Sequence, residues 1–254
     1  EPIPNSDGYK VSGRGELHLS ILLEGMRREG FELQVSRPEV IFKTINNEHM
    51  EPIEQLIITI PEENSGTIIE KLGRRKGNME NMQTENGVTK LEYLIPTRCL
   101  LGFRSEFIMD TKGEGLMDHS FMRYERHKGE IPGRQNGVLI SGENSVAVAF
   151  ALWNLQERGT IFIHPGTAVY EGMIIGENSR SEDMIVNPAK EKKLSNMRTS
   201  GSDEAIRLIP PREISLEQAL EFIENDELVE ITPKNVRLRK RYLTETERKR
   251  GGKM

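Results

Sequence analysis

The sequence lacks several features that membrane, secreted and disulfide-bonded proteins need. It has one cysteine, Cys99, which excludes an internal disulfide and is typical of a reducing cytoplasm. No apolar run is long enough to span a bilayer. The opening residues, Glu1-Pro2-Ile3-Pro4, have neither the basic nor the apolar region of a signal peptide. We therefore expect a cytoplasmic protein that does not act on a membrane.

Recognisable catalytic motifs are also missing. Gly13-Arg14-Gly15 lacks the further glycine and the Lys-Ser/Thr pair of a phosphate-binding loop, and it predicts a tight turn into a helix. The five histidines are not spaced as metal ligands, and no nucleophile motif is present. Cys99 opens a predicted helix, where its pKa can be lowered, but a small semi-buried residue is the favoured interpretation. The sequence predicts no catalytic residue, no metal site and no cofactor site.

Charge is distributed unevenly along the chain. The net charge is −5, yet residues 234–254 hold nine Lys/Arg against two Glu, a net charge of +7 that leaves −12 for the rest. An acidic body with a basic tail indicates a localised contact with a polyanion.

Residues 51–124 predict one complete small fold. A β-rich run at 55–60 stops at Pro61, a helix follows, and two strands at 78–84 and 88–95 are joined through Asn86-Gly87. A helix around 98–109 and a strand around 114–124 close a βαββαβ unit of the ferredoxin-like type.

The flanking sequence predicts less regular structure. A strand at 9–12, a helix containing Leu19 to Met26 and a strand at 31–36 form half of a second ferredoxin-like unit, and 43–50 is a linker. Further strands are expected at 138–140, 160–163, 172–176, 206–209 and 235–243, with helices at 143–158 and after a Ser215/Gln218 capping box. The stretch 177–204 is an irregular loop, and the tail after Thr244 is frayed.

Three groups of cations are candidates for binding RNA phosphates. The loop cations stand among small and hydroxyl residues, which suits an irregular RNA surface, although a solvated loop is the alternative. Arginines alternate along the last strand, where charge on an edge strand is the ordinary explanation. A triple cation ends one helix, where capping of the helix dipole explains it equally well. The candidates are Lys190, Lys192, Lys193 and Arg198 in the loop, Arg237, Arg239 and Arg241 on the strand, and Arg74, Arg75 and Lys76 at the helix end.

Several motifs resemble those of a known family. Glu51-Pro52-Ile53 and Gly102-Phe103-Arg104-Ser105 resemble domain V of elongation factor G-like translational GTPases. Ser12 to Leu19 is similar to the helix-opening motif of domain III in that family. Lys192 to Arg198 and Ser215 to Arg241 are similar to the C-terminal domain of the BipA/TypA GTPases. The resemblance implies an α+β chain made of part of a ferredoxin-like domain III (1–44), a ferredoxin-like domain V (45–128) and a mixed α/β C-terminal domain (129–254).

The resemblance also implies a function. Such a chain is the part of a ribosome-associated GTPase that docks on the ribosome, rRNA and the A-site tRNA, as a monomer, in translation, ribosome assembly and stress adaptation. GTP and Mg²⁺ belong to a GTPase domain that this sequence does not contain, so the chain itself is not expected to be an enzyme. The alternatives are the C-terminal part of a LepA-like GTPase and an enzyme with an unrecognised site in the C-terminal domain.

Overall fold

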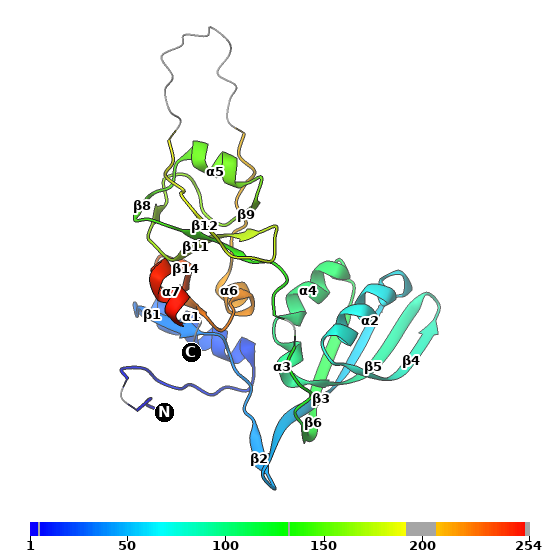
Figure 1. Cartoon of the computed structure of the whole chain (residues 1–254). Helices are drawn as coiled ribbons and strands as arrows, with labels where there is room; N and C mark the ends of the chain where they lie inside the picture. The colour runs from blue at the N-terminus through cyan, green and yellow to red at the C-terminus, as the bar shows by residue number, and fades with distance from the viewer. Residues whose placement is uncertain (5, 132, 192–206, 252–254) are drawn as a thin grey trace. The chain divides into compact units, whose positions relative to one another are not determined.

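The computed structural model describes residues 1–4, 6–131, 133–191 and 207–251 (Figure 1). The chain forms two compact units, one of residues 38–133 and one that joins residues 1–37 to the chain from 134 onward. The first residues belong with the C-terminal part because β1 (Leu33–Ser36) pairs antiparallel with β13 (Glu227–Ile231). Contacts alone therefore do not separate 1–44 as a segment of its own, and the three-part division remains a prediction.

The unit of residues 38–133 has the predicted βαββαβ order. Its four main strands form an antiparallel sheet in the order β4-β5-β3-β6, the strand order of the ferredoxin-like fold. The elements are β3 (Glu48–Pro61), the 3-10 turn η1 (Glu62–Asn64), α2 (Ser65–Arg74), β4 (Asn78–Glu85), β5 (Val88–Pro96), α3 (Thr97–Leu100), α4 (Phe103–Asp110) and β6 (Leu116–Arg126).

Two turns of this unit depend on asparagine and glycine. Asn86 and Gly87 have φ of 51° and 77°, so both adopt the left-handed conformation of the tight hairpin that the sequence predicted. The prediction of a linker at 43–50 was wrong. Asn46 and Asn47, with φ of 52° and 62°, turn the chain from β2 (Lys43–Ile45) directly into β3. Asparagine tolerates this conformation, and the Asn-Asn pair was the overlooked signal.

The core of this unit lies between one sheet face and the helices. Ile68 and Leu72 of α2 and Phe103 and Phe107 of α4 are buried against the sheet with Ile58 and its neighbours. The single helix predicted at 98–109 is two helices, α3 and α4. Gly102 between them has φ of 71°, which ends one helix and starts another.

The other unit is built on a seven-stranded sheet. The order is β1-β13-β14-β11-β7-β12, with β9 also paired to β11, and only β12 and β7 run parallel. A two-stranded ribbon of β8 and β10 stands beside it. Its strands beyond β1 and β13 are β7 (Val138–Ser141), β8 (Ser145–Val146), β9 (Gly159–Ile161), β10 (Ala168–Val169), β11 (Met173–Asn178), β12 (Met184–Val186) and β14 (Val236–Lys240).

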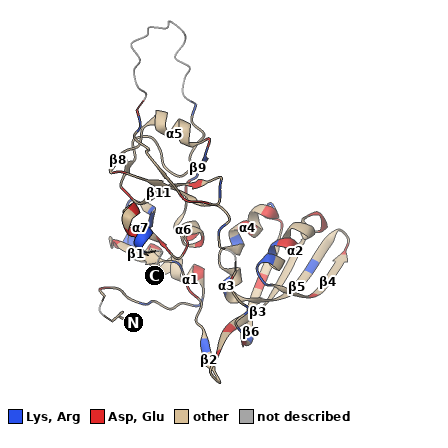
Figure 2. Cartoon of the chain, viewed as in Figure 1, with Lys and Arg blue, Asp and Glu red and all other residues tan. Residues whose placement is uncertain are grey.

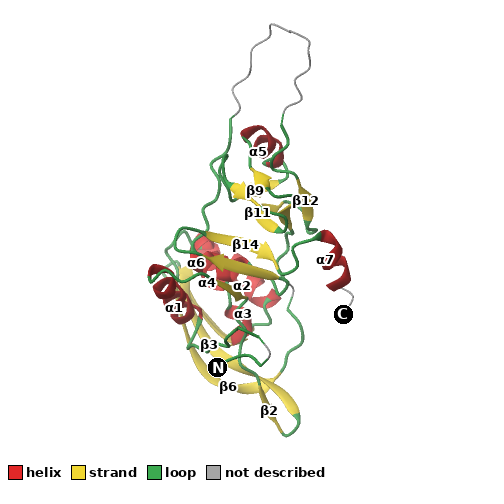
Figure 3. Cartoon of the chain, turned by 90° about the vertical axis from the view of Figure 1, so that its left-hand side faces the viewer, coloured by secondary structure: helices red, strands yellow, loops and turns green. Residues whose placement is uncertain are grey.

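This sheet separates two hydrophobic cores. Val138 and Ile140 of β7 enter the core that includes α6 (Leu216–Phe222), whereas Leu139 between them enters the core that includes α5 (Ala149–Leu155). Helix α1 (Glu16–Arg28) adds Leu23 to the first core, and α7 (Glu245–Gly251) follows β14 through a short turn (Figure 3). β7 is therefore buried on both faces of the sheet.

Several predictions for this unit need correction. The helix predicted at 143–158 is only α5, because the chain before it forms β8. Ala151, Leu152 and Leu155 are its buried residues, whereas Val146 and Trp153 are exposed. The irregular stretch 177–204 contains β12, residues 207–209 form no strand, and residues 9–12 form only a bridge from Tyr9 to Pro2. Residues 192–206, with part of the predicted loop and strand, lie outside the described residues. The Ser215/Gln218 capping box is confirmed.

Candidate nucleic-acid interface

Of the alternating arginines, Arg237 and Arg239 lie on β14, inside the sheet, and Arg241 follows directly after its last residue. This strand pairs with both β13 and β11, so the edge-strand explanation for its charge was wrong. Arg237 lies opposite Glu230 of β13, and Arg239 Nη1 lies 3.5 Å from Glu230 Oε1. The hydroxyl of Tyr170 donates to the other Glu230 oxygen at 2.6 Å. Among the described residues, Arg239 is therefore partly neutralised by Glu230, whereas Arg237 and Arg241 form no ion pair.

A helix follows this strand where a frayed tail was predicted. The Glu247 backbone N–H donates to Thr244 Oγ1 at 3.2 Å, and the Thr244 hydroxyl donates to Glu247 Oε2 at 2.8 Å, which caps the first turn of α7. Arg248 Nη1 donates to the carbonyl oxygens of Tyr242 and Leu243. The basic end of α7 is thereby held beside the end of β14 (Figure 2). Thr244-Glu245-Thr246-Glu247 has the capping-box pattern, a signal that its charge obscured.

The described residues on both sides of the predicted basic loop, which holds Lys190, Lys192, Lys193 and Arg198, form hydrogen bonds with the two ends of α5. The Val148 N–H donates to the Pro188 carbonyl at 2.9 Å on the outgoing limb. On the returning limb, Gln156 Oε1 accepts from the Ile209 N–H at 3.0 Å and its Nε2 donates to the Arg207 carbonyl at 3.3 Å. Lys190 is exposed near the first anchor. The other predicted loop cations, Lys192, Lys193 and Arg198, lie outside the described residues.

The three cations at the end of α2 have different surroundings. Arg75 Nη1 donates to the carbonyl oxygens of Cys99 and Leu101 at 2.9 and 3.1 Å, and its Nη2 lies 2.7 Å from Glu106. It therefore fastens α2 to the α3–α4 junction. Arg74 makes an exposed pair with Glu70, four residues earlier on the helix. Among the described residues, Lys76 has no charged partner.

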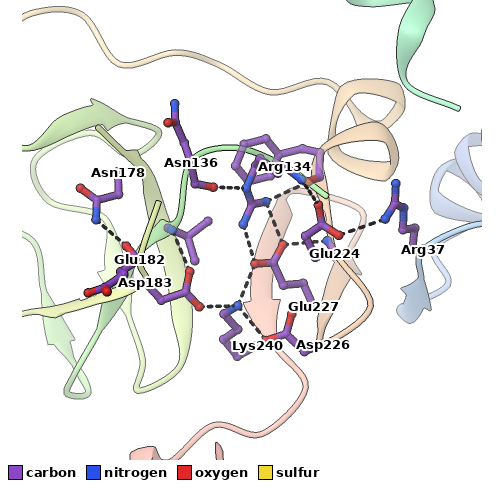
Figure 4. Close-up of polar contacts among 12 residues, drawn as sticks. Arg37, Arg134, Asn136, Asn178, Glu182, Asp183, Glu224, Asp226, Glu227 and Lys240 are labelled. Atoms are coloured by element: carbon purple, nitrogen blue, oxygen red, sulfur yellow. Dashed lines mark hydrogen bonds and ion pairs between the residues drawn. The ribbon is translucent and has the colours of Figure 1, made fainter. Parts of the chain in front are cut away.

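Val236 and Leu238 of β14 point to the α6 side of the sheet, and Lys240, the next residue on that face, is charged where an apolar residue is expected. Lys240 is only 3% exposed. Its ammonium lies 2.7 Å from Asp183, 2.9 Å from Asp226 and 2.9 Å from Glu227 (Figure 4). Arg134 makes a bidentate pair with Glu227 and donates to the carbonyls of Asn136 and Phe222. A charged residue at an apolar register position was the only sequence signal for this cluster.

The electrostatics of this cluster keep Glu227 and Lys240 charged. Burial favours a neutral Glu227, but the hydrogen bonds and charge of Arg134, with the Lys240 charge, outweigh burial and lower the pKa of its carboxyl. Burial also opposes the charged form of Lys240, but the facing carboxylates raise the pKa of its ammonium above the ordinary value. The cluster is a satisfied structural network, and its cations are not available to RNA.

Other parts of the described chain offer little chemistry. A cavity of about 230 Å³ beside the returning loop limb is lined mainly by leucine, isoleucine and proline, with Gln156 and His164 as its polar residues. Burial raises the pKa of the Cys99 thiol to about 12, opposite to the lowered value considered from its position at a helix start. Within the described ranges there is no cluster of three acidic, His or Cys side chains suited to a metal ion. No described helix has the length and apolar character to cross a membrane.

Comparisons with known proteins agree with this architecture. Residues 48–135 match the elongation factor G C-terminus, and residues 136–245 match the TypA/BipA C-terminal domain. The whole chain is 53% identical to a Salmonella typhimurium protein and 52% identical to an Escherichia coli protein, each named large ribosomal subunit assembly factor BipA. The Buchnera aphidicola protein of that name is 55% identical over 96% of the chain. The chain spans about 42% of the length of these relatives.

A solved structure from Thermus thermophilus aligns with 32% of the chain and 12% of its own length, at 23% identity and a TM-score of 0.31. The βαββαβ unit and its family match define the class of protein, an elongation factor G-like protein. The match of residues 136–245 then separates it from other members of that class. The chain belongs to the TypA/BipA family.

Proposed function

We propose that this chain docks a TypA/BipA protein on the ribosome by binding rRNA, and that it contacts the A-site tRNA. The observation that carries the proposal is the exposed end of β14 and α7, where Arg241 and Arg250 have no ion pair among the described residues. When unpaired protein cations contact RNA phosphates, the counterions condensed on the RNA are released. This release is a large part of the affinity of proteins for nucleic acids.

The relatives' name supports the large ribosomal subunit as the partner. GTP and Mg²⁺ are assigned to sequence that the relatives have outside the matched region, because no phosphate-binding loop occurs in this chain. In the whole protein, docking by this part would couple the state of the ribosome to GTP hydrolysis. We place the protein in the cytoplasm, bound to ribosomes and monomeric when free, with roles in translation, ribosome assembly and stress adaptation.

The ten proposed contact residues differ in their surroundings. Lys190, Arg237 and Arg241 remain the strongest described candidates, together with the loop cations Lys192, Lys193 and Arg198. Arg239 and Arg75 are committed to internal partners, and Arg74 and Lys76 are exposed at a helix end. No arrangement of side chains among the described residues favours an enzyme over this docking role, and the TypA/BipA match argues against a LepA-like protein.

Sedimentation with ribosomes across a salt series tests the proposal. Replacing Arg237 and Arg241 with Ala is expected to weaken binding and reduce the salt slope by about one unit per lost phosphate contact. Ala at Lys190, Lys192, Lys193 and Arg198 is expected to act in the same direction. Lys90→Ala is the matched control, because Lys90 is paired with Glu92 at 2.8 Å on the other unit. Unchanged affinity and slope in both charge variants would contradict RNA docking by these surfaces.

A further inference from the structure

Strands β2, β3 and β6 meet at the end of the sheet away from α2 (Figure 1). Exposed aromatic side chains lie on this part of the sheet. Phe121 of β6 is 59% exposed, and its ring centroid lies 5.4 Å from that of Tyr124. The ammonium of Lys43 lies over the Tyr124 ring, 4.3 Å from its centroid. These three residues form what we call the Phe121 platform: a free aromatic face, a second ring beside it, and a cation.

A second group of rings lies at the same end of the sheet. Phe42 stacks on His49 with centroids 4.8 Å apart and planes 16° apart, and His127 lies 5.8 Å from Phe42. The backbone N–H of His127 donates to the His49 carbonyl at 3.1 Å, which joins the end of β6 to the start of β3. Both histidines are exposed, and none of these rings belongs to the core of this unit. The sheet end therefore carries aromatic area that core packing does not explain.

Around the platform the cations Lys43, Arg123, Arg126 and Lys128 outnumber the acids Glu48, Glu54 and Glu125 by one. Arg123, Arg126 and Lys128 face the acids Glu48 and Glu125, to which they are paired. Lys43 adds a positive charge whose only described partner is the Tyr124 ring. Aromatic faces surrounded by a surplus of cations are the combination with which proteins bind single-stranded nucleic acids, because any base can stack and the phosphates meet the cations.

We propose that the Phe121 platform is a second RNA site, which stacks an unpaired nucleobase on Phe121 while Lys43 contacts the adjacent phosphate. This inference rests on the proposed rRNA docking and deepens it, because it assigns single-stranded RNA with an unstacked base to the unit of residues 38–133. The cations of β14 and α7 read only phosphates, whereas the platform requires a base that is free to leave its neighbours. A paired helix presents no such base.

The test measures fluorescence anisotropy of a labelled single-stranded RNA and of a blunt-ended, fully paired RNA duplex that contains the same strand, with the full chain. Phe121→Ala is expected to weaken single-strand binding about tenfold, with little effect on the duplex and an unchanged salt slope. Phe121→Trp keeps a π face and is expected to retain binding, whereas Phe121→Leu keeps only apolar bulk and is expected to lose it. Arg237→Ala with Arg241→Ala should instead reduce the salt slope. Because Phe121 is exposed, its three variants should unfold at the wild-type temperature.

Each other outcome overturns a stated part of the argument. If Phe121→Ala leaves single-strand affinity unchanged while the wild type sediments with ribosomes, the platform is not an RNA site and the docking proposal stands. If Phe121→Ala weakens ribosome binding but not binding to either RNA, the platform docks a ribosomal protein and the base-stacking inference is wrong. If the wild type binds neither RNA nor ribosomes, the docking proposal fails and the inference fails with it.

Discussion

Arg134 and Glu227 form a bidentate ion pair at 2.9 and 3.1 Å, in which the carboxylate is fully buried and the guanidinium is 14% exposed. The pair connects the chain that enters the C-terminal unit at Arg134 to the start of β13. Glu224, three residues before Glu227, accepts from the Arg134 backbone N–H at 2.6 Å and from Arg37 at 3.0 Å. Residues on both sides of the inserted unit of 38–133 are thereby fastened to one carboxylate.

Removing the Glu227 charge should severely destabilise the C-terminal unit, which here means the unit formed by residues 1–37 and the chain from 134 onward. Glu227→Gln leaves Arg134 and Lys240 facing each other without their shared anion, and breaking a buried ion pair from one side costs about 3–5 kcal/mol. Urea unfolding followed by the fluorescence of Trp153, the single tryptophan, reports on this unit. Glu157→Gln, on an exposed residue of the same unit, is the control and should unfold like the wild type. Equal midpoints for the two variants would mean that the network adds no stability.

The pair of His119 and Glu54 should make the stability of the unit of residues 38–133 depend on pH. The hydrogen bond that the His119 Nδ1–H donates to the Glu54 carboxylate raises the pKa of the imidazole against the opposing effect of burial. Burial raises the pKa of Glu54, but its hydrogen bonds to His119 and Thr97 outweigh burial and leave that pKa below its ordinary value. Stability from His119 is full below its unfolded pKa of about 6.5 and is lost as pH rises through the higher folded value. Stability from Glu54 is full above about pH 4.3 and is lost as pH falls through the lower folded value.

The two contributions overlap between about pH 4.3 and 6.5. The difference in melting temperature between the wild type and His119→Asn should be largest in that window and should shrink in alkaline solution. The effect is modest, because the His119 side chain is 46% exposed and solvent screens the charge. NMR titration of the imidazole gives the folded pKa directly. A melting difference that does not vary with pH would rule out the charged pair.

The sequence predicted the ferredoxin-like unit closely, because long alternating strands and the Asn86-Gly87 turn are strong local signals. It predicted the C-terminal unit less well. The strands β8 and β12 have two and three residues, too few to show a period, and they form because β10 and β7 lie beside them. Lys240 broke an apolar alternation, but its partners Asp183 and Glu227 are distant in the chain, so only the folded structure identifies them.

The candidate site was predicted in part for the same reason. Sequence reveals which residues are cationic, but not which of them are neutralised. Arg75 and Arg239 stand in patterns similar to those of Lys76 and Arg237, yet the fold gives the first two internal acceptors. In the Phe121 platform the two rings lie on β6 and Lys43 lies on β2, and no local pattern fixes the register of these strands, so the three residues could not be grouped before the sheet was known.

Cys99 should be unreactive in the folded protein. Its side chain is buried, and burial raises the pKa of the thiol to about 12, so almost no thiolate exists at neutral pH. Ellman's reagent is expected to leave the native protein unmodified for hours and to titrate one thiol per chain in denaturing urea. Rapid modification without denaturant would show that the α3–α4 junction opens readily.

The cap of α7 should determine whether the basic tail is helical. Thr244→Ala removes the hydroxyl that accepts from the Glu247 N–H and donates to the Glu247 carboxylate, at a cost of about 1 kcal/mol. Thr246→Ala is the matched control, because Thr246 is exposed on the same helix, two residues beyond the cap. Hydrogen–deuterium exchange of residues 245–251 should be about fivefold faster in Thr244→Ala than in the wild type, since about 1 kcal/mol corresponds to that factor. In Thr246→Ala it should be nearly unchanged. Equal exchange in both variants would show that the cap does not hold the helix.

The same variant tests whether α7 positions Arg250 for RNA. If it does, Thr244→Ala should also weaken ribosome binding without changing the charge of the chain.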